Sequence, residues 1–122
     1  MKGKVNAKRE AMVRLEVLGH RETRRNVNVI IDTGYTGSIS LPRKIIASLG
    51  MRRRGRRLAE LADGRIITFD YYSGFVTWHG RCIGVLVDES PGDPLVGMKL
   101  LEGSELKIQV RRGGAVSICP MR

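Results

Sequence analysis

The stretch from Val27 to Gly34 constrains the fold most, because a run of apolar, mostly β-branched residues leads directly into Asp32-Thr33-Gly34. Valine, isoleucine and threonine favour a pleated, half-buried strand. The strand ends where Gly34 allows the chain to turn, which leaves the carboxylate of Asp32 at the strand end. Such an aspartate either forms a turn, by accepting hydrogen bonds from backbone amides two residues on, or acts as a catalyst. An isolated Asp-Thr-Gly would favour the turn.

A second motif further along the chain changes this balance. Leu95-Val96-Gly97 is followed by the short apolar run Met98–Leu101, so that two apolar residues precede a glycine and a helical turn. Together the two motifs resemble the retropepsin-like aspartic proteases, the single-domain family that includes the retroviral proteases and their bacterial and eukaryotic relatives. The resemblance covers roughly residues 11–118. It is greatest to small prokaryotic members, whose first motif reads Asp-Thr-Gly-aromatic-Thr-Gly, as Asp32–Gly37 does here.

The resemblance implies an all-β fold: a closed acid-protease β barrel with one or two short helices, equivalent to half of a two-lobed pepsin. It makes residues 11–122 a single domain and residues 1–10 an N-terminal extension. It also implies that Asp32, Thr33 and Gly34 are catalytic, and that Leu95, Val96 and Gly97 are the structural second motif. Gly97 is expected to pass beneath the Asp32 turn, where only glycine lets two backbones approach closely.

The expected chemistry needs a second chain. Hydrolysis of a peptide by carboxylates needs two of them, one ionised and one protonated, and only one Asp-Thr/Ser-Gly is present. The other acids are expected on turns or on solvent-facing strand positions. We therefore expect a homodimeric aspartic endopeptidase in which water is activated between two copies of Asp32, with protein or peptide as substrate and no cofactor or metal. Tyr35, Thr36 and Met98 replace charged residues that retroviral members use at the dimer interface, which indicates a differently built interface.

Residues 57–69 contain a helix-favouring stretch, Leu58–Ala62, but Asp63-Gly64 indicates a hairpin turn. In the resembled family this interval holds the flap, a hairpin that closes over bound peptide, and the substrate-binding tip would be Ala62-Asp63-Gly64. The alternative is an ordinary surface hairpin. Elsewhere, patterns of hydrophobicity predict strands over 11–17, 24–31, 71–78, 81–87, 106–110 and 115–119, a helix over 41–49 and an acidic loop over 88–94.

The net charge of +10 includes a dense cluster at Arg52–Arg57, which makes nucleic acid a possible partner. No helix-turn-helix, zinc-finger or aromatic ribonucleoprotein pattern accompanies it. A solvated basic face, or attraction to acidic proteins, is therefore favoured over specific nucleic-acid binding. Two alternatives to the peptidase remain open. One is a catalytically idle dimer that binds extended peptides by strand addition, and the other is a basic nucleic-acid-binding β protein.

The cysteines and histidines have no spacing typical of a metal site. Cys82 and Cys119 are expected to be buried thiols, and His20 and His79 to lie in turns. The chain shows no apolar signal region at its start and no stretch near the about 20 apolar residues of a membrane span. We therefore expect a cytoplasmic protein without a membrane partner.

Overall fold

The computed structural model describes residues 1–122. It contains two short α-helices, α1 (Arg43–Ser48) and α2 (Met98–Leu101), and one 3-10 turn, η1 (His20–Glu22). Its strands are β1 (Lys2–Val5), β2 (Ala11–Leu18), β3 (Arg24–Ile31), β4 (Ile39–Leu41), β5 (Arg52–Glu60), β6 (Ile66–Trp78), β7 (Arg81–Glu89), β8 (Leu95–Val96), β9 (Ser104–Ile108) and β10 (Ala115–Pro120). The predicted strand-rich class with few helices is confirmed. No helix is both long enough and apolar enough to cross a membrane.

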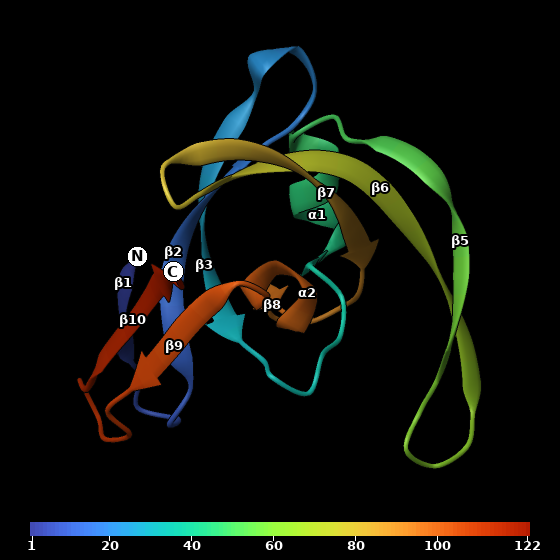
Figure 1. Ribbon diagram of the computed structural model, residues 1–122. Helices are drawn as coiled ribbons and strands as arrows, with labels where there is room; N and C mark the ends of the chain where they lie inside the picture. Colours follow the sequence, from blue (N-terminus) through green and yellow to red (C-terminus); the bar gives the residue numbers. More distant parts are fainter.

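All ten strands belong to one strongly curved sheet, in the order β5-β6-β7-β4-β8-β3-β2-β1-β10-β9 (Figure 1). A further pairing of β6 with β2 makes the run from β6 to β2 return on itself. The side chains that face the inside of this ring form the core. Its completely buried members are Leu15, Val17, Val29, Ile39, Leu41, Val76, Val87, Val96 and Ile118.

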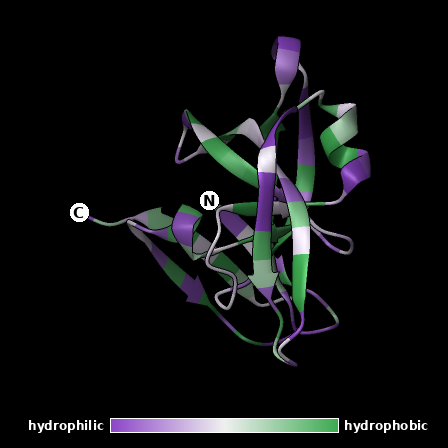
Figure 2. Cartoon of the chain, turned by 90° about the vertical axis from the view of Figure 1, so that its right-hand side faces the viewer, coloured by the Kyte–Doolittle hydropathy of each residue, from purple (hydrophilic) through white to green (hydrophobic).

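The β2–β3 hairpin carries the predicted period-two pattern. Burial alternates along β2, so that Val13, Leu15 and Val17 are buried while Arg14 is exposed. The same alternation is visible as bands of hydrophobic and hydrophilic colour along the strands (Figure 2). The register pairs Leu15 with Val27, and β3 ends one residue before Asp32. The hairpin therefore delivers the aspartate to a fixed point, as predicted.

Two element boundaries differ from prediction because tertiary pairing overrides local pattern. The predicted helix over 41–49 is shorter, since Leu41 is completely buried and pairs with Glu89 in the sheet, and α1 begins only at Arg43. The acidic loop expected from Asp88 begins later for the same reason. Ser40 pairs with Asp88, so β7 extends to Glu89.

The hairpin predicted around Asp63-Gly64 is present as β5–β6, and it projects from the body of the protein (Figure 1). Its turn is one residue longer than the two-residue type. The Leu61 N–H donates to the Arg65 carbonyl at 2.7 Å, and Gly64 alone of the tip residues has a positive φ, of 85°. A three-residue loop that ends in a left-handed glycine has this pattern. The tip is therefore Ala62-Asp63-Gly64, as expected.

The segment expected to be an N-terminal extension instead supplies a strand. β1 lies between β2 and β10 and pairs with both, and Val5 is buried in the core. This strand cannot be recognised from the sequence, because a four-residue strand with only one buried residue produces no clear alternation.

The cysteines also differ from expectation. Cys82 and Cys119 are both exposed rather than buried. Cys82 lies on the solvent-facing side of β7, and Cys119 follows Ile118, the last buried residue of β10.

Replacing Gly3 with alanine should destabilise the protein. A Cβ at Gly3 would lie 1.8 Å from the Met12 carbonyl oxygen, so β1 must move away from β2. We expect urea denaturation to show a loss of about 1–3 kcal/mol in the free energy of unfolding. Lys4→Ala is the control, because Lys4 is exposed on the same strand. Equal stability of the two variants would mean that β1 does not contribute to the fold.

Candidate active site

Asp32 is held at the end of β3 by three backbone contacts. Its N–H donates to the Val96 carbonyl at 2.9 Å, and its carbonyl accepts from the Tyr35 N–H at 3.1 Å. Its carboxylate oxygen Oδ1 accepts from the Gly34 N–H at 2.9 Å. Asp32 is half-buried, whereas Thr33 and Gly34 are exposed. The aspartate therefore forms its own turn and also presents a carboxylate to solvent.

The second motif lies directly against the first, as predicted. β3 and β8 pair in parallel, with Ile31 opposite Val96. A Cβ at Gly97 would lie 2.3 Å from the Gly37 carbonyl oxygen, so only glycine fits there. The Gly97 N–H also donates to the Ser38 carbonyl at 3.0 Å. Gly97 thus packs against both Gly37 and Tyr35, the residue whose N–H closes the Asp32 turn.

Tyr35 connects this loop to the buried acid Asp88. The Tyr35 hydroxyl donates to Asp88 Oδ2 at 2.6 Å. Asp88 is only 7% exposed, so the expectation that every other acid lies on a turn or a solvent-facing position is wrong for this residue. Burial raises the pKa of the Tyr35 phenol, and the hydrogen bond to Asp88 and the charge on that carboxylate raise it further.

The other oxygen of Asp88, Oδ1, accepts no hydrogen bond. The cation beside it is Arg57 of β5, whose Nη1 lies 3.6 Å away. The Arg57 guanidinium also lies over the Tyr71 ring, 4.1 Å from its centroid. Arg57 therefore joins the projecting hairpin to the buried acid on the body of the protein.

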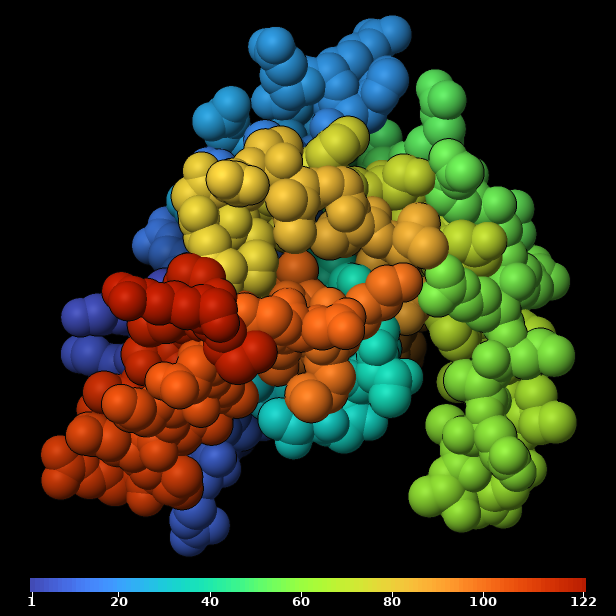
Figure 3. Space-filling view, in the orientation of Figure 1, coloured from blue at the N-terminus to red at the C-terminus, as the bar shows by residue number.

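These residues line a cavity of about 710 Å³ between the β5–β6 hairpin and the loop after Asp32. Figure 3 shows the hairpin standing away from the body across an open groove. The hairpin contributes its strands rather than its tip: Leu58, Ala59 and Ile67 line the cavity, while Ala62, Asp63 and Gly64 are exposed and do not. The loop contributes Tyr35, Thr36 and Gly37.

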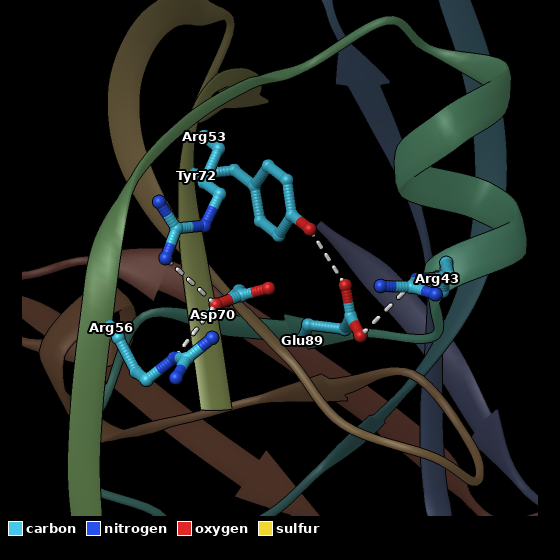
Figure 4. A network of polar contacts seen from close by, with 6 residues as sticks. All are labelled: Arg43, Arg53, Arg56, Asp70, Tyr72 and Glu89. Atoms are coloured by element: carbon cyan, nitrogen blue, oxygen red, sulfur yellow. Dashed lines mark hydrogen bonds and ion pairs between the residues drawn. The ribbon is translucent and has the colours of Figure 1, made fainter. Parts of the chain in front are cut away.

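The remaining polar groups of this region form two further clusters (Figure 4). Asp70 pairs with Arg53 at 3.2 Å and with Arg56 at 3.5 Å, and the hydrogen bond from Arg53 lowers the pKa of its carboxyl. Glu89 accepts from the Tyr72 hydroxyl at 2.7 Å, which raises the pKa of that phenol. Arg43 lies 3.6 Å from the same carboxylate. Part of the arginine cluster is thus neutralised by acids on neighbouring strands.

A second hollow, of about 340 Å³, lies beside Asp32 and Thr33. Its other walls are mostly apolar and include Ile31, Ile108 and Val110. Val110 is 73% exposed, so part of this apolar wall is open to solvent. Asp32 therefore lines this apolar hollow, whereas the larger cleft is lined by Tyr35, Thr36 and Gly37, which follow it in the chain. No three His, Cys, Asp or Glu side chains are grouped so that they could hold a metal ion.

Comparison with known proteins identifies the fold. No protein-family model and no curated protein sequence matches the chain. Among solved structures, a retropepsin-like aspartic protease from Rickettsia conorii aligns with a TM-score of 0.60 and 14% identity, over 100% of this chain and 91% of that one. The chain has a retropepsin-like fold. The protease of EIAV, solved in complex with the inhibitor HBY-793, also aligns with a TM-score of 0.60, at 19% identity over 80% of this chain and 89% of that one.

The retropepsin-like fold accounts for the pairing of the two motifs that the sequence suggested. At these identities the likeness concerns the fold alone. A functional role for Asp32 would therefore rest on its own geometry, and one for Asp88 or Arg57 on contacts that no motif describes. A signal for Asp88 was present in the sequence, because it continues directly from the apolar run of β7.

Tyrosine absorbance rises as phenols lose their protons at alkaline pH. Below about pH 11, one unit above the ordinary tyrosine pKa, this rise should be the same in Tyr35→Phe as in the wild type. This result is expected because burial raises the pKa of Tyr35 and keeps its phenol neutral in that range. The measurement is absorbance at 295 nm against pH, with Tyr71→Phe as the matched variant. A loss of absorbance change below pH 11 in Tyr35→Phe would show that the phenol is accessible to solvent.

Proposed function

We propose that the protein is a homodimeric aspartic endopeptidase that hydrolyses peptide bonds. The observation that carries this proposal is the position of Asp32, a half-buried carboxylate that is fixed by the Gly34 N–H and by the β3–β8 pairing and that lines an apolar hollow. In the proposed reaction one Asp32 carboxylate takes a proton from water while the other, protonated, polarises the scissile carbonyl. Gly34 leaves room for the substrate backbone, and Thr33 braces the two turns against each other.

The second carboxylate must come from a second copy of the chain. Asp88 is a buried acid near the loop after Asp32, but one of its oxygens is bonded to Tyr35 and the other faces Arg57. It is therefore not free to share a proton with Asp32. A two-fold axis beside Asp32 would bring two identical carboxylates together.

One of the two free edges of the sheet, that of β9, supports this arrangement, while the other belongs to β5 of the projecting hairpin. β9 is the last strand in the order. The residues just before and after it bond toward β10: the Gly103 carbonyl accepts from the Met121 N–H, and the Gln109 N–H donates to the Ala115 carbonyl. Both residues are odd-numbered, so the odd-numbered residues of β9 are the ones that face β10. The N–H and C=O groups of the even-numbered residues, including Leu106, therefore point away from β10. Antiparallel pairing of β9 with its own copy about Leu106 would set Glu105 opposite the partner subunit's Lys107, and vice versa.

This self-pairing explains the exposed surface beside Asp32. Ile108 at the end of β9 and Val110 beyond it line the apolar hollow that also contains Asp32 and Thr33. A second copy docked on β9 would cover this surface.

The proposed substrate is an extended segment of protein or peptide bound in the 710 Å³ cleft. The β5–β6 hairpin is proposed to act as a flap that lowers its tip, Ala62-Asp63-Gly64, over the bound chain. Leu58 and Ile67 face the cleft from the strands of the hairpin, with exposures of 71% for Leu58 and 41% for Ile67. Large apolar side chains exposed on the strands of a projecting hairpin fit contact with a partner or substrate.

The two alternative functions are less well supported. A catalytically idle peptide-binding dimer would use the same cleft, but it would not need the carboxylate of Asp32. A nucleic-acid-binding role depends on free positive charge along β5. There Arg53 and Arg56 share Asp70 and Arg57 faces Asp88, which leaves Arg52 and Arg54 of the cluster without an acid at ion-pair distance. No contact in the structure favours either alternative.

Mixing wild-type chains with Asp32→Asn chains tests the dimer and the catalytic pair together. If both chains fold and exchange freely, an equal mixture leaves about one quarter of the dimers with two carboxylates, so activity should follow the square of the wild-type fraction. The measurement is the rate of peptide cleavage against mutant fraction after co-refolding, using a substrate found by screening a diverse peptide library.

The control mixture replaces Asp32→Asn with Glu102→Gln, which removes an exposed acid elsewhere and should leave activity in proportion to total protein. Sedimentation should show dimers in both mixtures. A straight-line loss with Asp32→Asn would mean that one chain suffices, and the proposal would fail.

Charge reversal on β9 tests the proposed interface. Lys107→Glu would place the new glutamate opposite the partner subunit's Glu105, and this repulsive pair would occur twice in a symmetric dimer. We therefore expect the dimer dissociation constant to rise about tenfold. The double variant Glu105→Lys/Lys107→Glu restores opposite charges and should recover dimerisation. Sedimentation at several concentrations measures both. Failure of the double variant to recover would show that these side chains do not face each other.

A further inference from the structure

A chain of contacts runs from the projecting hairpin to the Asp32 turn. Arg57 of β5 faces Asp88 of β7 at 3.6 Å, and Asp88 accepts the Tyr35 hydroxyl at 2.6 Å. The Tyr35 N–H in turn donates to the Asp32 carbonyl at 3.1 Å. Three contacts therefore link a side chain on the hairpin to the backbone of the candidate catalytic residue.

The end of this chain at the turn is rigid. The Tyr35 carbonyl accepts from the Met98 N–H at 2.8 Å, and the tyrosine packs so closely on Gly97 that a Cβ there would lie 2.6 Å from its ring. Tyr35 therefore has little freedom to move alone. A shift of its hydroxyl must be transmitted to the backbone that holds Asp32.

The end at the hairpin is adjustable. Asp88 Oδ1 is buried without a hydrogen-bond donor, and the Arg57 Nη1 beside it lies just beyond hydrogen-bonding distance. An unpaired buried oxygen is costly, and a charge-assisted bond to arginine would remove that cost. A small inward movement of β5 would form this bond, and an outward movement would leave the carboxylate without a cation.

We propose that Arg57, Asp88 and Tyr35 form a relay that couples the position of the β5–β6 hairpin to the position of Asp32. Asp88 and Arg57 are then positioning residues: they touch no reacting atom, but closure of the hairpin draws Arg57 onto Asp88 and steadies the Asp32 turn through Tyr35. This inference extends the proposed peptidase function, since the hairpin is its proposed flap.

The arginine cluster supplies a matched control for the relay. Arg56 is the next residue along β5, is ion-paired as Arg57 is, and lies 3.5 Å from Asp70. Its acid does not contact the loop after Asp32. Arg56→Gln and Arg57→Gln therefore remove the same charge from adjacent positions of one strand, and only the second interrupts the relay.

Amide hydrogen exchange, followed residue by residue by nuclear magnetic resonance, tests the relay without requiring activity. We expect Arg57→Gln to speed exchange at the Gly34 and Tyr35 amides about fivefold or more. Arg56→Gln should leave both amides unchanged, and Arg57→Lys should recover part of their protection. Urea denaturation of each variant verifies that the chain is folded. Equal exchange in Arg57→Gln and Arg56→Gln would overturn the proposal.

A double-mutant cycle on peptide cleavage supplies the second measurement. If the relay operates, Tyr35→Phe and Arg57→Gln interrupt the same chain, so the double variant should lose no more kcat than the more affected single variant. Losses that multiply would show that the two residues act independently. If the wild type cleaves no peptide in the library, the proposed peptidase function fails, and the exchange measurement still decides the relay.

Discussion

The structure depends on the parallel pairing of β3 with β8, which fixes where one carboxylate leaves the sheet. The Asp32 N–H is bonded to the Val96 carbonyl, and the glycine that follows β8 packs against the loop that follows the aspartate. Two segments more than sixty residues apart therefore define a single point in space. The roles proposed for the cleft, the apolar hollow and the free β9 edge all depend on where these features lie relative to Asp32.

The sequence was sufficient for the features that depend on local pattern. Alternation in residues 11–17 and 24–31 predicted the hairpin that carries Asp32, because one face of each strand is buried and the period of two is then unambiguous. Asp63-Gly64 predicted the projecting hairpin, because left-handed backbone is needed at its turn. The two motifs together predicted the fold that the solved structures share.

Features that arise from tertiary pairing could not be predicted in this way. The four residues of β1 carry one buried side chain, and their place in the sheet depends on partners at both ends of the chain. Asp88 looked like the start of a polar loop, because burial of an acid is decided by the phenol and guanidinium brought to it from other strands. The edge position of β9 is a property of the whole strand order.

The pairing of β1 with β10 also determines when this protein can fold. Gly3 pairs with Val116, so β1 finds one of its two neighbours only after more than a hundred further residues have been added to the chain. Contacts so distant in sequence make folding slow, because the loop between them must close before they are formed. A chain that still lacks β10 therefore cannot complete the β1-β10-β9 end of the sheet. Because β9 pairs with β10, its free edge is fixed in place only after that step.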